Sequence, residues 1–244
     1  MSTRFVHYIA RFSFLVFGPC SLVPLVYGQT YDPYIDTTIL QRIDHRLPPF
    51  RFHVEATLEP ADSQSLPWRL LHDYQITVLD SSGHDSIQTI SDPIDIPEWS
   101  RGGNMPGFDD ANFDGFPDLF YVQFEGATGN EGYSFWLYDT TTHRFAYSDS
   151  FSQLCSPYID HDSNEIKTVE NCGGACRKCT TYVVRGNLPV PVSFLNIDFD
   201  RAAPETKPLH CIRGRIENGR EIILEDWHAG WEVYDRPEVN PWKP

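Results

Sequence analysis

Short segments of alternating apolar and polar residues make up much of this chain, and they constrain its fold more than any other feature. Residues 50–60, FRFHVEATLEP, alternate as a strand with one buried face does. Residues 73–90 read as a strand, a Ser-Ser-Gly turn and a second strand. Helical periodicity is scarce, so we predict an all-β fold of irregular antiparallel sheets, with a distorted, β-propeller-like arrangement.

Three further hairpins are expected in the second half of the chain. The first joins residues 119–124, LFYVQF, to 133–139, YSFWLYD, and continues into 145–151, FAYSDSF. A second joins residues 164–171 to 180–186 and is closed by the cysteine-rich tip CGGACRKC. The third covers residues 212–227, with Asn218 and Gly219 as a two-residue turn.

The first 28 residues have the composition of a secretory signal. Arg4 and Arg11 precede an apolar run that ends at Gly28, and no acidic residue occurs among them. The run is short and interrupted by prolines, which disfavours a permanent membrane span. A lipid anchor on Cys20 is the alternative. We therefore predict a periplasmic or secreted protein with a signal at 1–28, a surface leader at 29–50 and a single β domain at 51–244.

The charge of the chain limits its partners. The formal net charge is −15, and loss of Arg4 and Arg11 with the signal would make it −17. Such a protein repels nucleic acid and anionic membranes, and it attracts cations and basic proteins. A purely solubilising role for the charge is the alternative.

Five cysteines remain after the signal: Cys155, Cys172, Cys176, Cys179 and Cys211. In an oxidising compartment we expect two disulfides and one odd thiol. The spacing in NCGGACRKC could also hold zinc, but no fourth ligand is evident at a suitable spacing.

The stretch DDANFDGFPD, residues 109–118, crowds four aspartates and an asparagine before an apolar strand. Carboxylates at this density repel one another unless a cation lies among them. Oxygen-bearing side chains fall at loop positions one, three, five and nine, glycine falls at six, and position seven offers a backbone carbonyl; this is a calcium-loop spacing. The predicted ligands are Asp110, Asn112, Asp114, Phe116 through its carbonyl, and Asp118. The alternative is an empty acidic turn held by Asx hydrogen bonds.

This loop does not continue as an EF-hand, because position twelve is Tyr121 in a β-like run. It is similar to the strand-to-strand calcium loops of integrin-type and FG-GAP propellers. The order DANFDGFPDL, GATGNEGY, FWLYDTTTHRF and a cysteine-tipped hairpin also resembles a family of exported bacterial proteins. Its characterised members are periplasmic immunity proteins with a distorted propeller fold. They inhibit lysozyme-like effectors delivered by bacterial-killing type IV secretion systems.

The resemblance implies an inhibitor whose partner is a basic, lysozyme-like peptidoglycan hydrolase. A lysozyme cleft holds two carboxyl groups, so an inhibitor needs a protruding loop with hydrogen-bond donors. The segment GATGNEGY, residues 126–133, suits this role. We expect Thr128, Gly129, Asn130 and Tyr133 to contact the partner, with Tyr133 as a rigid anchor at the loop tip. The cysteine-rich tip at 172–179 is the competing element.

Two other classes of function would use different residues of the sequence. An enzyme could use Glu125, Asp139 or Asp149 with a histidine base at 143, 161 or 210, but none stands in a catalytic motif, so we predict no enzymatic activity. A calcium-stapled extracellular carbohydrate-binding or adhesive module is the stronger alternative. Its candidate residues are Trp227, Trp231 and Trp242.

Overall fold

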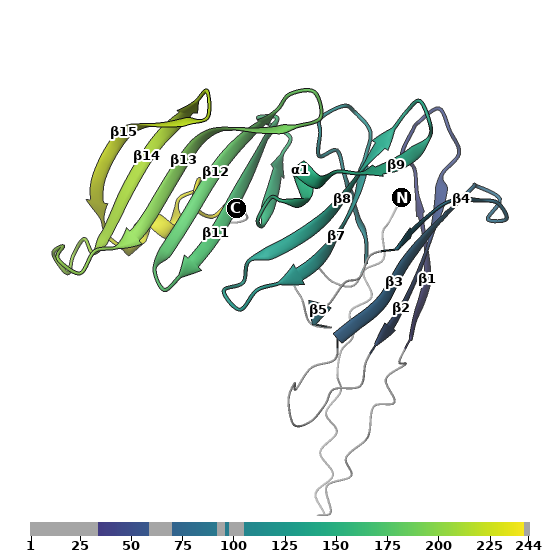
Figure 1. Cartoon of the computed structure of the whole chain (residues 1–244), viewed down its shortest axis with the longest axis horizontal. Coiled ribbons are helices and arrows are strands. Elements are labelled where there is room, and N and C mark those ends of the chain that lie inside the picture. The colour runs from purple at the N-terminus through teal and green to yellow at the C-terminus, as the bar shows by residue number, and fades with distance from the viewer. Residues whose placement is uncertain (1–33, 59–69, 92–95, 98–104, 242–244) are drawn as a thin grey trace, which may run out of the picture. The chain divides into compact units, whose positions relative to one another are not determined.

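A computed structural model describes residues 34–58, 70–91, 96–97 and 105–241 of the 244-residue chain. The predicted signal at 1–28 and Trp242 lie outside these residues. The described strands form three antiparallel sheets, which confirms the all-β class (Figure 1). Within the same residues none of the sheets closes on itself and no propeller is detected. None of the helices described is long and apolar enough to cross a membrane.

The strands follow one another along the chain, sheet by sheet. The N-terminal sheet consists of β1 (Tyr34–Gln41), β2 (Phe50–Leu58), β3 (Leu70–Leu79) and β4 (Ser86–Ser91), with β5 (Ile96–Pro97) paired to β3. The middle sheet consists of β6 (Gly107–Asp109), β7 (Asp118–Glu125), β8 (Glu131–Asp139) and β9 (Arg144–Tyr147). The C-terminal sheet consists of β10 (Pro157–Asp160), β11 (Glu165–Gly173), β12 (Cys176–Val184), β13 (Pro189–Phe199), β14 (Leu209–Glu217) and β15 (Arg220–Ala229). A short helix, α1 (Asp149–Ser152), follows β9, and a 3₁₀ helix, η1 (Trp231–Asp235), follows β15.

Three apolar clusters hold these sheets together. The first joins the N-terminal and middle sheets and includes Phe52 and Leu119, both without exposed surface. The second joins the middle sheet, α1 and the start of the C-terminal sheet through Phe135, Phe151 and Ile166. The third lies on one face of the C-terminal sheet, against η1. Burial of one such side chain stabilises the fold by roughly 1.5–3 kcal/mol.

The segment predicted as a surface leader is part of the fold from residue 34 onward. Strand β1 pairs with β2 along its whole length. Ile43 and Asp44, which follow β1, are 4 % and 1 % exposed. The alternation in YIDTTILQ, residues 34–41, is the signal that the leader interpretation missed, and the boundary at residue 50 is therefore corrected.

The predicted hairpins are present, with differences at their ends. Asn218 and Gly219 both have positive φ, at 52° and 73°, as a two-residue turn between twisted strands requires. Residues 149–152 form α1 and do not extend β9. Strand β13 is not among the strands predicted from the sequence. Pro191 is tolerated because it pairs with Tyr182 where the register shifts, at a bulge between β12 and β13.

The cysteines form one disulfide among the described residues, and the expectation of two is corrected. Cys172 and Cys176 are bridged across the β11–β12 tip, with their Cα atoms 5.1 Å apart. Cys155, Cys179 and Cys211 are free. Cys179 and Cys211 lie in the apolar cluster of the C-terminal sheet on strands that β13 separates. Burial raises the pKa of the Cys179 thiol to about 12, which keeps it unreactive at neutral pH.

Candidate functional site

The acidic stretch forms the connection between β6 and β7 in the middle sheet. Asp109 ends β6 and pairs directly with Asp118, the first residue of β7. The Asp118 side chain has no exposed surface. Its Oδ1 accepts a hydrogen bond from the backbone N–H of Tyr138 at 2.8 Å, and its Oδ2 accepts one from Ala111 at 3.1 Å. A buried carboxylate thus ties the loop to β8.

Side-chain oxygens fold the rest of this loop around its own backbone. The two oxygens of Asp110 accept hydrogen bonds from the N–H groups of Asp114 at 2.9 Å and Gly115 at 2.8 Å. Asn112 Oδ1 accepts a second bond from Asp114 N–H at 3.1 Å, and Asp114 Oδ1 accepts one from Phe116 N–H at 3.0 Å. Gly115 has φ +92°, a conformation that L side chains resist. Four of the five predicted ligands therefore already point oxygens into one turn.

The charge of the loop is uncompensated in its buried part. The pKa of Asp118 is raised to about 7, mainly by burial and also by the nearby carboxylates of Asp114 and Asp110, although its two backbone hydrogen bonds lower it. Oxygen-only donors of this kind suit a hard cation, which would remove the repulsion. The same hydrogen bonds also describe an acidic turn held by Asx bonds, the alternative that the sequence left open.

A further observation limits the metal interpretation. Among the residues that the structure describes, no three His, Cys, Asp or Glu side chains lie close enough together to hold a metal ion. The set predicted from the sequence also uses the amide of Asn112 and the carbonyl of Phe116. The Asn112 Nδ2 group donates to Asp114 Oδ2 at 2.8 Å and to Asn187 Oδ1 at 3.2 Å. Calcium at this loop therefore remains a prediction.

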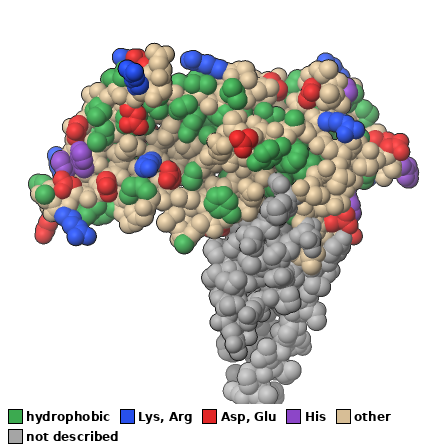
Figure 2. Space-filling model, in the orientation of Figure 1, with side chains coloured by type: hydrophobic (Ala, Val, Ile, Leu, Met, Phe, Trp, Pro, Cys, Tyr) green, Lys and Arg blue, Asp and Glu red, His purple; other side chains and the backbone are tan. Residues whose placement is uncertain are grey.

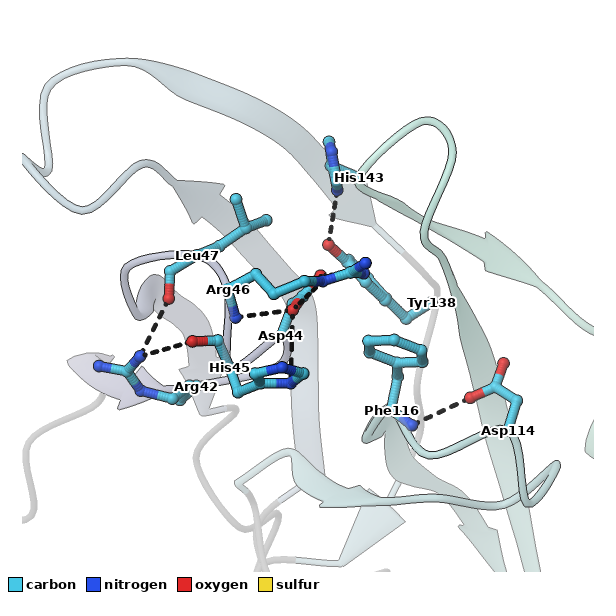
Figure 3. Close-up of polar contacts among 9 residues, drawn as sticks. All are labelled: Arg42, Asp44, His45, Arg46, Leu47, Asp114, Phe116, Tyr138 and His143. Atoms are coloured by element: carbon cyan, nitrogen blue, oxygen red, sulfur yellow. Dashed lines mark hydrogen bonds and ion pairs between the residues drawn. The ribbon is translucent and has the colours of Figure 1, made fainter.

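Aromatic contacts fix the outer side of the acidic loop. The Phe116 ring lies 6.0 Å from the Tyr138 ring, and the Arg46 guanidinium lies 5.6 Å from its centroid (Figure 3). Arg46 in turn donates to both oxygens of buried Asp44, at 2.9 Å and 2.7 Å, and this contact lowers the pKa of Asp44 to about 2. The region between β1 and β2 thus packs on the loop, a contact that no local pattern predicts.

The glycine-rich turn leaves the other end of β7. Gly126 N–H donates to the Asn130 carbonyl at 2.7 Å, and Gly129, with φ +76°, donates to the Gly126 carbonyl at 2.8 Å. The Asn130 side chain accepts from Asn171 N–H at 2.7 Å and donates to the Asn171 carbonyl at 3.0 Å. Thr128 and Gly129 are exposed. The turn therefore protrudes, while Asn130 clamps it to β11.

Tyr133 does not lie at the tip of this turn, and its predicted placement is corrected. It is the third residue of β8, because the turn ends at Asn130 and β8 begins at Glu131. Its ring lies 6.0 Å from those of Phe120 and Phe135, and its hydroxyl donates to Glu131. Burial raises the pKa of the Tyr133 hydroxyl. This side chain holds the base of the turn.

Two carboxylates beside Tyr133 were not predicted as a pair. Glu125 and Glu131 lie directly opposite each other on β7 and β8. One oxygen of each, Glu125 Oε2 and Glu131 Oε1, is buried without a hydrogen-bond partner. Like charges placed opposite one another destabilise a sheet. The alternation of residues in the strands on either side of the turn could have revealed that Glu125 and Glu131 face each other.

The remaining candidates from the sequence are dispersed. His161 contacts Asp109 at 2.6 Å, His210 contacts Asp226 at 2.6 Å, and His143 contacts the Tyr138 hydroxyl at 3.0 Å. Asp139 accepts from Thr141 N–H and Asp149 from Gln153 Nε2, so both serve local turns. The Arg213 guanidinium lies 5.6 Å from the Trp227 ring, and Trp231 stacks between Phe199 and Tyr234. The structure does not bring these groups together in one site.

Comparison with known proteins identifies the fold. No family model matches the chain, and no match is found among curated proteins. A solved structure described as that of a Xanthomonas type IV secretion system related protein matches with a TM-score of 0.52 at 15 % sequence identity. The match covers 78 % of this chain and 99 % of that protein. The chain is thus an all-β protein that shares the fold of a protein related to a type IV secretion system.

Proposed function

We propose that this protein is an exported, periplasmic or secreted inhibitor or immunity protein that blocks a basic, lysozyme-like peptidoglycan hydrolase. The observation that carries the proposal is the fold likeness to a protein related to a type IV secretion system. The motif order around the acidic loop supports the same class of protein. The proposed role needs no catalytic group in this chain.

The β7–β8 turn is the element that would enter the partner's cleft. Its tip, Thr128 and Gly129, is exposed, and the two hydrogen bonds between Asn130 and Asn171 tie its base to β11. A turn that is fixed before binding loses less conformational entropy when it binds. Thr128 would offer a hydroxyl donor to the carboxyl groups of the cleft. Asn130 and Tyr133 would support the turn rather than contact the partner.

The acidic loop would support the same turn from the opposite end of β7. Asp110, Asn112, Asp114, Asp118 and the Phe116 carbonyl would hold calcium there. A bound hard cation would supply positive charge among carboxylates that otherwise repel one another. In either state Asp118 joins the loop to β8 through its two backbone hydrogen bonds.

The net charge of −15 favours a basic partner. A hydrolase that acts on an anionic wall polymer is commonly basic, and opposite charges accelerate encounter. The rate of association should therefore fall as the salt concentration rises.

Inhibition of wall lysis by purified lysozyme-like hydrolases tests the proposal, with one added charge at the turn. Thr128→Asp places a carboxylate against the carboxyl groups of the cleft, so we expect at least about a thirtyfold loss of inhibition. Asn218→Asp adds the same charge to the β14–β15 turn and should leave inhibition unchanged. Equal inhibition by both variants would exclude the β7–β8 turn, and absence of inhibition by the unaltered protein would refute the function.

A further inference from the structure

The two faces of the C-terminal sheet differ in what covers them. One face carries Val169, Leu195 and Ile197, which pack in an apolar cluster with Val233 of η1. The opposite face carries Glu170, Lys178 and Asn196 at neighbouring positions on β11, β12 and β13. Lys178 is exposed, and Glu170 and Asn196 are partly exposed. This second face is therefore open to solvent where these side chains lie.

Strand register arranges the side chains of the open face into two rows that cross the strands. In the first row Glu170 pairs with Lys178, and Lys178 pairs with Asn196. In the adjacent row Thr168 pairs with Thr180, Thr180 with Phe194, and Phe194 with Gly214. Successive side chains of a row lie beside one another on the same face. The rows run perpendicular to the strands, and their side chains are polar except at Phe194 and Gly214.

A groove of about 390 Å³ lies over side chains of both rows and extends to Ile216 of β14 and Glu221 of β15. Its walls come from the end of α1 and from each strand between β11 and β15. Phe194, which lines the groove, packs its ring against Gly214, where a Cβ atom would lie 2.5 Å from the ring. The Phe194 ring therefore packs directly against the backbone of Gly214, and Phe194 is only 5 % exposed. The lining residues are Gln153, Cys155, Thr168, Glu170, Lys178, Thr180, Tyr182, Phe194, Asn196, Ile216 and Glu221.

The chemistry of this lining suits hydroxyl groups. Thr180, Asn196 and Gln153 offer neutral donors and acceptors, and Tyr182 adds a partly exposed aromatic ring. Charges of both signs are present, Lys178 with Glu170 and Glu221, so the groove carries no strong field of one sign. Figure 2 likewise shows charges of both signs scattered over the visible face. A ligand with many hydroxyls and no net charge matches these groups.

Other ligand classes match the groove less well. The net charge of −15 repels nucleic acid. An extended peptide would use the backbone groups of a sheet edge, whereas this face offers side chains. A flat apolar ligand would need exposed rings, and Phe194 is buried. Five strands at about 4.8 Å spacing give the groove a length of about 19 Å, which suits a chain of several linked units.

We infer that this groove binds a linear, uncharged oligosaccharide. Hydroxyl groups of successive sugar units bond to Thr180 and Asn196, and one sugar face packs near Tyr182. The site is separate from the β7–β8 turn, and the inference does not depend on the proposed inhibition. It also differs from the tryptophan-based carbohydrate site expected from the sequence.

Isothermal titration calorimetry with N-acetylchitohexaose and cellohexaose tests the inference, with a wall stem peptide as the control ligand. The unaltered protein should bind at least one of the oligosaccharides and not the peptide. Asn196→Ala and Thr180→Val each remove a hydrogen-bonding group and should weaken binding at least tenfold. Ser193→Ala and Thr181→Val make matched changes outside the groove on the same strands, and they should leave binding unchanged.

Thermal unfolding of each variant shows that its fold is retained, and two independent groove variants keep the test decisive if one is unstable. Absence of oligosaccharide binding at millimolar concentration would overturn the inference. Binding that survives both groove variants would place the ligand elsewhere. Binding of the stem peptide alone would identify the groove as a peptide site.

Discussion

Strand β7 has a connection at each end, and the two are stabilised in opposite ways. The acidic loop before it is folded by its own side chains, which accept backbone N–H bonds within residues 110–116. The turn after it is held from outside, by Asn171 of β11. The first concentrates negative charge around buried Asp118. The hydrogen bonds that hold the second join neutral amide groups, although Glu125 and Glu131 lie opposite each other at its base.

This difference implies different sensitivities to solution conditions. The stability of a connection whose carboxylates repel one another should change with pH and with added cations, because both change the electrostatic repulsion. The amide hydrogen bonds between Asn130 and Asn171 should respond to neither. An equal response of the two connections to pH and to cations would therefore contradict this comparison.

The largest expected effect concerns Asp118 in the presence of a chelator. Its pKa is raised from 3.8 to about 7, so the folded state favours the protonated carboxyl. The stability from this group is fully present below about pH 3.8 and is lost as the pH rises through about 7, by up to about 4 kcal/mol. Asp118→Asn cannot ionise and should lack this loss. Urea unfolding from pH 4 to pH 8 should show the unaltered protein losing stability relative to Asp118→Asn, and parallel curves would contradict the prediction.

Calcium should reverse part of that loss. At about a hundredfold excess over Kd, a ligand that binds only the folded state adds roughly 2.7 kcal/mol, which is visible as a raised melting temperature. Asp114→Ala removes a predicted ligand and should abolish the shift. Asp162→Ala, in the turn between β10 and β11, is the matched control and should keep it. Identical melting of the unaltered protein in calcium and in chelator would leave the Asx-bonded turn as the explanation.

The smallest effect concerns the clamp. Asn130→Ala removes two hydrogen bonds to β11 and should lower the free energy of unfolding by about 1–2 kcal/mol. Thr128→Ala, at the exposed tip, should change it by less than about 0.5 kcal/mol. Neither variant should alter a calcium-induced shift in melting temperature. An altered shift in Asn130→Ala would show that the two ends of β7 are coupled.

Local alternation was sufficient to predict most strands, because a strand with one buried face needs only that pattern. It failed at β13, where Pro191 lies beside a bulge that leaves Val192 of the same strand without a partner on β12. At β1 the alternation was present but was outweighed by the mixed composition of the surrounding residues, and the segment is a paired edge strand. At β13, by contrast, the pairing with β12, and not the segment itself, decides the outcome.

Within the candidate site, spacing along one loop was predictable and contacts between distant segments were not. The oxygens of Asp110, Asn112 and Asp114 meet in one turn because few residues separate them. The bonds between Asn130 and Asn171 join residues 41 apart, and the contact of Arg46 with Phe116 joins two sheets. Tyr133 was misplaced because the position at which β8 begins depends on its pairing with β7.

The bridge between Cys172 and Cys176 spans only four positions along the chain. A cross-link that closes so small a ring restrains the unfolded chain little, since the entropic benefit grows with the number of residues enclosed. It also joins no two sheets, which instead rely on their apolar clusters. Recombinant production in a reducing cytoplasm should therefore yield folded protein, and a thiol reductant should loosen only the tip of one hairpin.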